Sequence, residues 1–337
     1  MSATAPASPG GGDRPSVTVV IPVRDDAIRL ARCLESVARD SYPGERQVLV
    51  ADNGSRDDSA EVARRSGARV LDLPGLSVAQ LRNRAAEEAT TDVLAFIDAD
   101  HAIAEGWLTA AASSMSLDGV GAAGLAYVAP EHATWVQRAY DRFRPRLRGI
   151  VDTDWLGSGN LAVWKHAFDR VGGFDTTLET CEDVDLCNRL RLAGYRLLSD
   201  DRMRSVHFGD PATLAAVFAG ELWRGRDNIR VTLRGPLSPG ALPSLVIPIA
   251  NLACLVGTLA GVMGAAWGGL RLSAACLALI AATIALRAAR MSRRDGAEPW
   301  WRLLPQNAAV ACAYEMGRAL ALVVRATHRT RRERAGA

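Results

Sequence analysis

The sequence has 337 residues, of which 23% are charged, and its formal net charge is +3. This length suffices for one large domain or two ordinary ones. The charge is unevenly spread, because residues 287–337 contain eleven arginines and four acids, which leaves −4 for residues 1–286. This asymmetry argues against a nucleic-acid-binding body and predicts a basic C-terminal region that binds anionic phospholipid.

The cysteines and the N-terminal residues indicate an intracellular protein. The six cysteines show no CxxC spacing and no disulfide framework, so we expect reduced thiols and no structural zinc. Residues 1–15 are rich in Ala, Pro, Gly and Ser and lack a basic region followed by an apolar one. We expect a disordered lead there rather than a signal peptide.

Apolar strands and helices alternate from residue 16 onward. Strands are expected at 17–23, 47–51, 69–73 and 92–97, with helices over 26–39, 57–67 and 77–88 between them. Continuous apolar strands in this order predict an α/β fold with a mostly parallel sheet flanked by helices. Ligands of such sheets bind beyond the carboxyl ends of the strands.

The C-terminal part has a different composition, since residues 235–270 carry no charge. Segments 241–270 and 272–286, joined at Arg271, predict a transmembrane helical hairpin within 241–290. The next residues, RAARMSRRD, are expected to form a basic loop that lies in the cytosol, which also places the N-terminal domain in the cytoplasm. Region 291–337 is basic, and we expect an interfacial amphipathic helix at 306–324 rather than a third span. The alternative is a buried hairpin of a soluble protein.

The stretch DVLAFIDADHAI (92–103) places two carboxylates directly after a buried strand. Asp98 and Asp100 occupy alternate positions, so in an extended segment both side chains project to the same side. Carboxylate oxygens are the ligands that Mg²⁺ or Mn²⁺ prefers, and such an ion neutralises a diphosphate. The alternative is that both acids only cap the next helix.

Other stretches accompany this one, namely IPVRDD (21–26), ADNGSRDDS (51–59), GSGNLAVWKHAFDRVGGFD (157–175) and CEDVDLCNRLRLAGYRL (181–197). In this order and spacing they resemble a family 2 glycosyltransferase of the GT-A fold. The resemblance covers roughly two-thirds of the chain and implies a glycosyltransferase domain at 16–232.

The resemblance implies a role for each matching residue. It implies that Asp183 is the general base and that Asp100 binds the metal bridging the diphosphate. It implies nucleotide-sugar binding by Pro22, Val23 and Asp25 around base and ribose, Asp52 at the nucleobase, Arg82 beside the nucleotide, Asp98 at the ribose or sugar, and Gly159 and Asn160 in the sugar and acceptor pocket.

The residues around Asp183 support its role independently. Thr180, followed by Glu182 and Asp183, predicts a capped helix start. Carboxylates in the first turn are stabilised by roughly 0.3–1 kcal/mol each, which favours an ionised base at Asp183. We also expect Glu182 to bind the donor. The alternative is that Glu182 and Asp185 only cap the helix.

Three further residues carry weaker expectations. Trp223 and Arg224, in GELWRGRDN (220–228), contact the acceptor or phosphates in this interpretation. Processive members of the family often have a QxxRW motif in this region. The chain has no such motif, which argues against a processive polymer synthase. His207 is a candidate metal ligand, and a structural histidine is the alternative.

Together these features predict a membrane-anchored, inverting glycosyltransferase. It would transfer sugar from a nucleotide-sugar to a lipid-linked acceptor or cell-envelope glycan, as a multi-pass protein of the inner (plasma) membrane. No nucleophile for a covalent intermediate stands out. A catalytically silent scaffold that binds nucleotide or sugar is one alternative. A nucleotidyltransferase is another, but no Gly-rich, basic phosphate loop follows the first strand.

Overall fold

The computed structural model describes residues 14–236, 240–265, 269–294 and 299–335. The expected disorder of the N-terminal lead falls almost wholly on residues outside these ranges. The chain divides into two compact units, and both are discontinuous in sequence. The first comprises residues 1–130 and 145–209, and the second comprises residues 131–144 and 210–337.

An eight-stranded mixed sheet forms the centre of the first unit, in the order β3-β2-β1-β4-β8-β6-β9-β7. The first four strands in sequence are parallel neighbours, as predicted, whereas β8 runs antiparallel between β4 and β6. Strand β9 pairs parallel with β6 and antiparallel with β7. The strands are β1 (Val17–Val23), β2 (Arg46–Asp52), β3 (Arg69–Asp72), β4 (Val93–Ile97), β6 (Val120–Gly124), β7 (Ile150–Asp152), β8 (Asn160–Trp164) and β9 (Arg196–Asp200).

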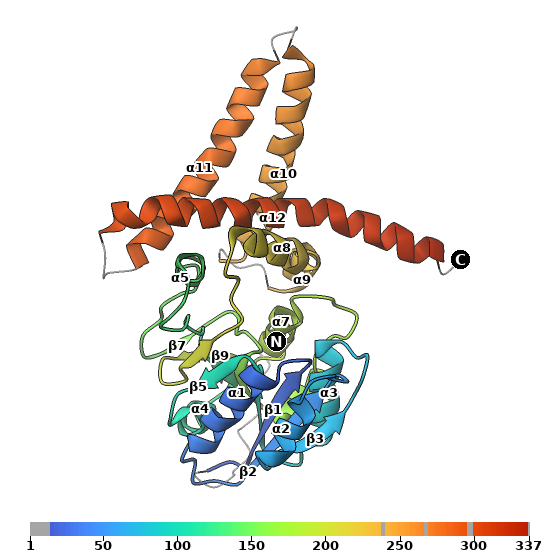
Figure 1. Cartoon of the computed structure of the whole chain (residues 1–337), viewed down its shortest axis with the longest axis vertical. Coiled ribbons are helices and arrows are strands. Elements are labelled where there is room, and N and C mark those ends of the chain that lie inside the picture. The colour runs from blue at the N-terminus through green and yellow to red at the C-terminus, as the bar shows by residue number, and fades with distance from the viewer. Residues whose placement is uncertain (1–13, 237–239, 266–268, 295–298, 336–337) are drawn as a thin grey trace. The chain divides into compact units, whose positions relative to one another are not determined.

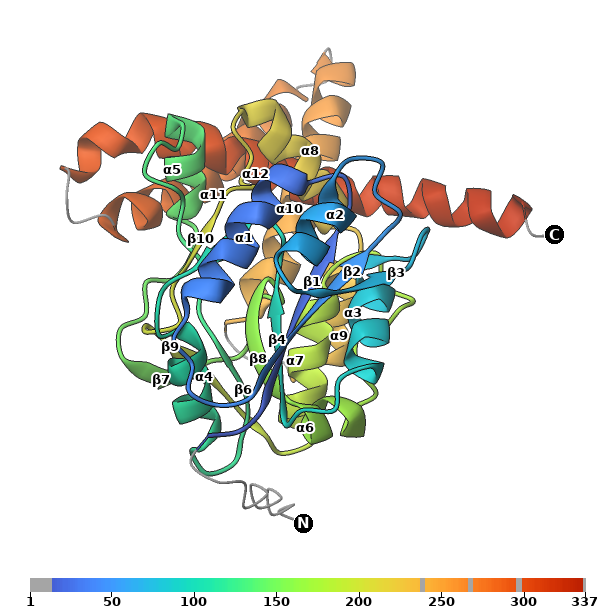
Figure 2. The ribbon, with the colours of Figure 1, turned by 60° about the horizontal axis from the view of Figure 1, so that its bottom comes forward.

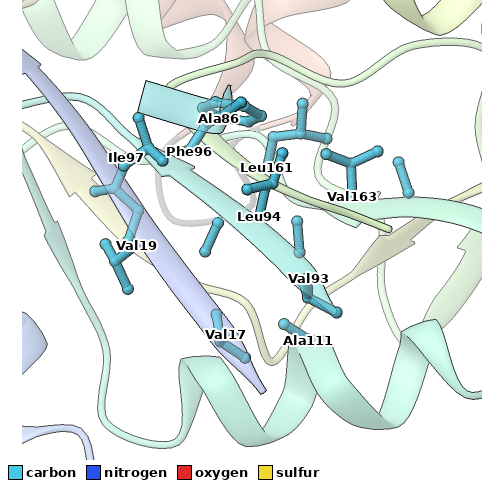
Figure 3. Packing of buried hydrophobic residues seen from close by; sticks show 14 of the residues in the cluster. Val17, Val19, Ala86, Val93, Leu94, Phe96, Ile97, Ala111, Leu161 and Val163 are labelled. Carbon is cyan, nitrogen blue, oxygen red and sulfur yellow. The ribbon is translucent and has the colours of Figure 1, made fainter. Parts of the chain in front are cut away.

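Helices flank this sheet, as the continuous apolar strands predict (Figure 2). Side chains of β1, β4 and β8 pack together in the core, and Val19, Phe96 and Leu161 are fully buried there (Figure 3). The mostly parallel α/β fold is therefore confirmed. The helices are α1 (Ala27–Arg39), α2 (Ser59–Arg65), α3 (Val78–Glu87), α4 (Trp107–Met115), α6 (Lys165–Arg170) and α7 (Glu182–Leu192).

A second, two-stranded sheet follows the carboxyl end of β4. Strand β5 (His101–Ile103) pairs antiparallel with β10 (Ser205–His207), and His101 lies directly opposite His207. An isolated bridge joins Val128 to Val206. These pairings bring the 205–207 segment to the residues that follow β4, although about a hundred residues separate them in sequence.

The second unit is helical (Figure 1). Helices α10 and α11 and residues 300–324 of α12 are each long and apolar enough to cross a membrane. The predicted junction at Arg271 is wrong, because Arg271 lies inside α11, which has 25 residues and extends past Arg287 and Arg290. The basic stretch thus continues the helix instead of forming a loop. The helices are α5 (Trp135–Asp141), α8 (Leu214–Arg224), α9 (Asn228–Arg234), α10 (Leu242–Met263), α11 (Leu270–Arg294) and α12 (Trp300–Ala335).

Helix α12 packs against α8 and the hairpin through buried charged groups. Glu221 of α8 is fully buried and accepts hydrogen bonds from Arg318 at 2.6 Å and from the Tyr140 hydroxyl at 2.6 Å. Glu315 pairs with Arg287 of α11 and accepts a hydrogen bond from Asn251 of α10. Burial alone would raise the pKa of Glu221, but the charges of Arg318 and Arg224 lower it. The buried carboxylate therefore depends on its arginine partners.

Removal of one partner should destabilise this unit. In Arg318→Met, Glu221 loses an ion pair while it stays buried, and broken buried pairs typically cost about 3 kcal/mol or more. We expect the melting temperature of the full chain in detergent to fall by roughly 6 °C or more. The double variant Glu221→Met with Arg318→Met should recover most of the loss. An unchanged melting temperature for the single variant would show that the pair contributes nothing.

Candidate functional site

Two predicted acids, at the carboxyl ends of β1 and β2, are linked through Ser55. Pro22 and Val23 are buried in β1, and Val23 lies opposite Asp52, which is 4% exposed. Asp25 has a φ of 51°, and its backbone N–H donates to the Ser55 hydroxyl at 3.0 Å. The Ser55 N–H donates to Asp52 at 3.2 Å. The structure thus brings these four predicted residues to one edge of the sheet, where the acids could accept hydroxyl or amide hydrogen bonds.

Glycines close the space around the two carboxylates after β4. A Cβ at Gly159 would lie 2.6 Å from Asp98 Oδ2 and 3.1 Å from His101 Nε2. A Cβ at Gly209 would overlap Asp100 Oδ2 and lie 2.9 Å from His207 Nε2. No other residue type fits at either position without displacing a carboxylate. The predicted importance of Gly159 therefore has a steric reason, whereas Gly209 was missed.

Asp100, His101 and His207 form a cluster whose ligand atoms all lie within 4.8 Å of one another. His207 Nε2 is 3.1 Å from Asp100 Oδ2, so the predicted pair is brought together. His101 was not predicted, although it directly follows Asp100 in DADH. Its Nδ1 lies 3.2 Å from the Ser205 hydroxyl, which leaves Nε2 directed at Asp100, 4.0 Å from Oδ1. One carboxylate and two imidazoles could hold a divalent cation.

The charges around Asp100 keep its carboxyl ionised. Burial acts to raise the pKa of Asp100, but the His207 hydrogen bond and the charges of His207, His101 and Arg29 together lower it. Arg29 of α1 lies 3.8 Å from Asp100 Oδ2. An ionised carboxylate is the form that binds a cation.

An aromatic ring supports the two histidines. The Tyr127 ring centroid lies 4.7 Å from that of His101 and 4.5 Å from that of His207. The histidine rings are themselves 4.7 Å apart. Tyr127 directly precedes Val128, which forms a bridge with Val206 of β10. This bridge keeps the Tyr127 ring next to β10. Sequence reasoning gave no signal for Tyr127.

Asn160 uses its amide within the protein. It is 1% exposed, accepts a hydrogen bond from Trp107 Nε1 at 2.7 Å, and donates to the Leu125 and Met203 carbonyls at 2.9 Å each. These bonds join β8 to the chain before β10 and to α4. The predicted contact of Asn160 with a sugar stays a prediction.

Arg82 connects the acid after β4 to the start of α7. Its side chain is 3% exposed, and its two terminal nitrogens contact Asp98 Oδ1 at 2.6 Å and Glu182 Oε1 at 2.9 Å. Glu182 is followed by Asp183, whose Oδ1 accepts a hydrogen bond from Val184 N–H at 2.8 Å. The predicted residues Arg82, Asp98, Glu182 and Asp183 thus belong to one connected group.

The environment of Asp183 suits a general base. Burial, followed by the neighbouring Glu182 charge, raises the pKa of Asp183 to about 7, against the lowering effects of Arg82 and of backbone N–H groups. A carboxylate with such a pKa accepts a proton far more readily than an ordinary aspartate. The helix start itself differs from the prediction, because Cys181, with a φ of 61°, is the N-cap and makes no side-chain capping bond. Thr180 is therefore not the cap.

Trp223 and Arg224 lie at the end of α8, in the second unit. Arg224 donates hydrogen bonds to the Tyr140 hydroxyl and to Glu221, both at 3.2 Å. Trp223 is 46% exposed. Their contact with an acceptor or with phosphates stays a prediction.

Comparisons with known proteins agree with this geometry. Residues 18–173 match the family described as Glycosyl transferase family 2. The chain is 31% identical over 194 residues to glycosyltransferase AglE of Haloferax volcanii, a match that covers 54% of this chain and 64% of that protein. It is 28% identical over 259 residues to the succinoglycan biosynthesis protein ExoA of Rhizobium meliloti, covering 71% of this chain and 78% of that one. The match therefore spans just under two thirds of the Haloferax protein.

The fold has a solved counterpart. The mannosyltransferase PcManGT from Pyrobaculum calidifontis, in complex with GDP-Man and Mn²⁺, superposes with a TM-score of 0.61. The superposition covers 93% of this chain and 87% of the other, at 19% sequence identity. It shows that the two chains share the GT-A fold.

Proposed function

We propose, from the match of residues 18–173 to Glycosyl transferase family 2, that the chain transfers a sugar from a nucleotide-sugar to a hydroxyl acceptor with inversion at the anomeric carbon. One observation carries the proposal. The cation cluster at Asp100 and the raised-pKa acid Asp183 of α7 belong to one unit, and Arg82 pairs with a neighbour of each, Asp98 and Glu182.

The donor would bind across the carboxyl ends of β1, β2 and β4. Asp25 and Asp52 would accept hydrogen bonds from base and ribose, and Pro22 and Val23 would form the floor. Asp98, whose side chain is 34% exposed, could accept a bond from a ribose or sugar hydroxyl. GDP-Man in the Pyrobaculum enzyme supports a nucleotide-sugar as the donor class.

Asp100 and His207, with His101 beside them, would hold the divalent cation. The three ligand atoms lie close enough to share one ion, and the charges around Asp100 favour its ionised form. Imidazole nitrogen suits Mn²⁺ better than Mg²⁺, which prefers oxygen ligands. When bound, the ion would offset the negative charge of the departing diphosphate.

Asp183 would act on the acceptor. Its carboxylate takes the proton of an acceptor hydroxyl while that oxygen forms a bond to the anomeric carbon. The bond from this carbon to the diphosphate oxygen breaks in the same step, and the nucleoside diphosphate leaves with the bonding electrons. A single displacement of this kind inverts the configuration. Arg82, Glu182 and the start of α7 hold the base in place.

The second unit supports a membrane-bound acceptor. Helices α10 and α11 leave most of their apolar side chains exposed, including Val256, Leu259 and Leu277, as expected of helices in contact with lipid. We propose that they form a multi-pass anchor in the plasma membrane with the sheet domain in the cytoplasm. An acceptor dissolved in the membrane, such as a polyprenyl phosphate, is the favoured class, because the same chain carries these apolar helices. A role for ExoA in succinoglycan biosynthesis supports an envelope glycan product.

A test of the function uses the full chain in lipid vesicles. A truncation before α12 would remove Arg318 and leave Glu221 buried without this partner, so it is not a fair test. Purified protein is mixed with a panel of nucleotide-sugars and Mn²⁺, and release of nucleoside diphosphate is measured with and without polyprenyl phosphate. We expect release that requires both the cation and the acceptor.

The alternative functions give different results in the same assay. Nucleotide-sugar binding without any release, also with soluble sugar acceptors, would favour a silent binding scaffold. Pyrophosphate release from a nucleoside triphosphate would favour a nucleotidyltransferase. Equal turnover of a soluble acceptor and a vesicle-borne one would show that membrane presentation plays no part.

A further inference from the structure

The guanidinium of Arg82 is held almost out of contact with solvent. Its side chain is 3% exposed, and both terminal nitrogens are engaged by carboxylates, Asp98 at 2.6 Å and Glu182 at 2.9 Å. The third nitrogen, Nε, is buried and makes no hydrogen bond. Three of its five N–H groups make no such contact, but because the side chain is almost fully buried a donor could reach them only after the surrounding side chains had moved. This burial argues against a direct contact with the nucleotide, which the family resemblance implies.

Helix α3, which carries Arg82, is held at its N-terminus and at Asn83, the residue after Arg82. Ser77 and Gln80 form a capping box at the start of α3. Asn83 exchanges two hydrogen bonds of 2.9 Å with the backbone of Phe174, and the Phe174 ring lies 5.5 Å from the guanidinium carbon. Arg82 therefore extends from a rigid support and acts on its carboxylates as a fixed brace.

We propose that Arg82 is a positioning residue that joins the donor-side acid Asp98 to the acidic start of α7, and so holds Asp183 at a set distance from the bound sugar. The proposal rests on the proposed function, since it assigns the way in which the two halves of that site are aligned. A planar guanidinium can bind two carboxylates in different directions, whereas a lysine ammonium is a point charge without a fork. The two ion pairs join α3 to the residue after β4, 16 positions away, and to the start of α7, 100 positions away.

The same brace also sets the charge around Asp183. Glu182 contributes a negative charge that favours the protonated form of Asp183, and Arg82 contributes a positive charge that favours the ionised form. Backbone N–H groups of Val184 and Ser158 also favour the ionised form. Cys187, one turn further along α7, is neutral because burial raises the pKa of its thiol to about 12. Neutralising Arg82 and neutralising Glu182 should therefore move Asp183 in opposite directions.

The experiment compares kcat, donor KM and the pH dependence of kcat for Arg82→Gln, Arg82→Lys and Glu182→Gln in the full chain. We expect kcat to fall by about 10- to 100-fold in all three while donor KM changes little, because misplacement of a reacting group by an ångström can cost about 10²-fold. The acidic limb of the profile should move to higher pH in Arg82→Gln and to lower pH in Glu182→Gln. It should stay near its original position in Arg82→Lys, which keeps the charge.

Arg189→Gln is the matched control. Arg189 pairs with Asp185 of the same helix at 2.7 Å but lies outside the site. We expect it to lower the melting temperature without moving the pH profile. A rise in donor KM for Arg82→Gln, with the acidic limb unmoved, would make Arg82 a donor ligand and overturn the proposal.

A second measurement keeps the proposal testable without turnover. Infrared pH titration of the full chain, with Asp183→Asn as the difference reference, follows the Asp183 carboxyl directly. Opposite displacements in Arg82→Gln and Glu182→Gln are expected here as well, and equal or absent displacements would contradict the proposal. If the wild-type chain transfers no sugar, the proposed function fails, and this titration still decides whether Arg82 braces Asp183.

Discussion

Replacement of Asp183 by Asn is expected to lower kcat by about 10²- to 10⁴-fold and to leave the affinity for nucleotide-sugar unchanged. The carboxylate has a raised pKa and follows a helix start that Arg82 holds by Glu182. Asparagine keeps the size of the side chain and cannot accept the acceptor proton. Steady-state kinetics would give kcat, and calorimetry would give donor affinity.

The pH dependence of the wild-type enzyme belongs to the same prediction. Only the ionised form of Asp183 accepts a proton, and its pKa is about 7. Transfer should therefore rise with pH through this region and level off above it, and Asp183→Asn should lose this limb. Asp185→Asn is the control, because Asp185 is a buried acid of the same helix that pairs with Arg189. Loss of donor binding in Asp183→Asn would reassign Asp183 to the donor site.

Replacement of Asp100 by Ala should lower kcat by about 10³-fold, because stabilisation of a leaving group by a bound cation is worth several kcal/mol. The carboxylate is the anionic member of the cluster with His101 and His207, so its loss should also weaken Mn²⁺ binding. Paramagnetic resonance of added Mn²⁺ measures the second effect without turnover. Chelation should inactivate the wild-type chain, and added Mn²⁺ should restore it.

Asp92 supplies a matched control for Asp100. It immediately precedes β4, at the end opposite Asp100, where it accepts hydrogen bonds from Ser16. Asp92→Ala should keep Mn²⁺ binding and transfer, apart from a modest loss of stability. Full turnover of Asp100→Ala in the presence of chelator would exclude the cation role.

The first half of the fold was predictable because its signals are local. Apolar runs of strand length separated by helical segments determine β1 to β4 and their parallel order. The later strands could not be placed, because β8 enters antiparallel between β4 and β6, a pairing that joins Ile97 to Asn160. No periodicity within either strand records such a partner. The length of α11 was underestimated for a different reason, since arginines ended the apolar run but not the helix.

Site residues that directly follow a strand could be predicted from the sequence. Site residues that are brought together by contacts between distant parts of the chain could not. Asp98 and Asp100 could be placed from β4 alone. The approach of His207 to Asp100 depends on the β5–β10 pairing, and the contact of Arg82 with Glu182 joins residues a hundred positions apart. His101 was overlooked although it is adjacent to Asp100, because a single histidine after DAD carries no pattern of its own. The positive φ of Cys181 likewise has no signature in sequence.

The discontinuous second unit has a consequence for protein engineering and for synthesis on the ribosome. Helix α5 is translated well before the residues that it contacts. Tyr140 donates a hydrogen bond to Glu221, and Arg142 donates one to Asn307, which is 165 residues later. The nascent 131–144 segment can therefore complete its contacts only after nearly the whole chain has been synthesised. A chimera that exchanges the second unit at a single junction would separate α5 from α8 and α12. Such a graft requires three junctions, near residues 130, 145 and 210, so that both pieces of the second unit come from the same parent.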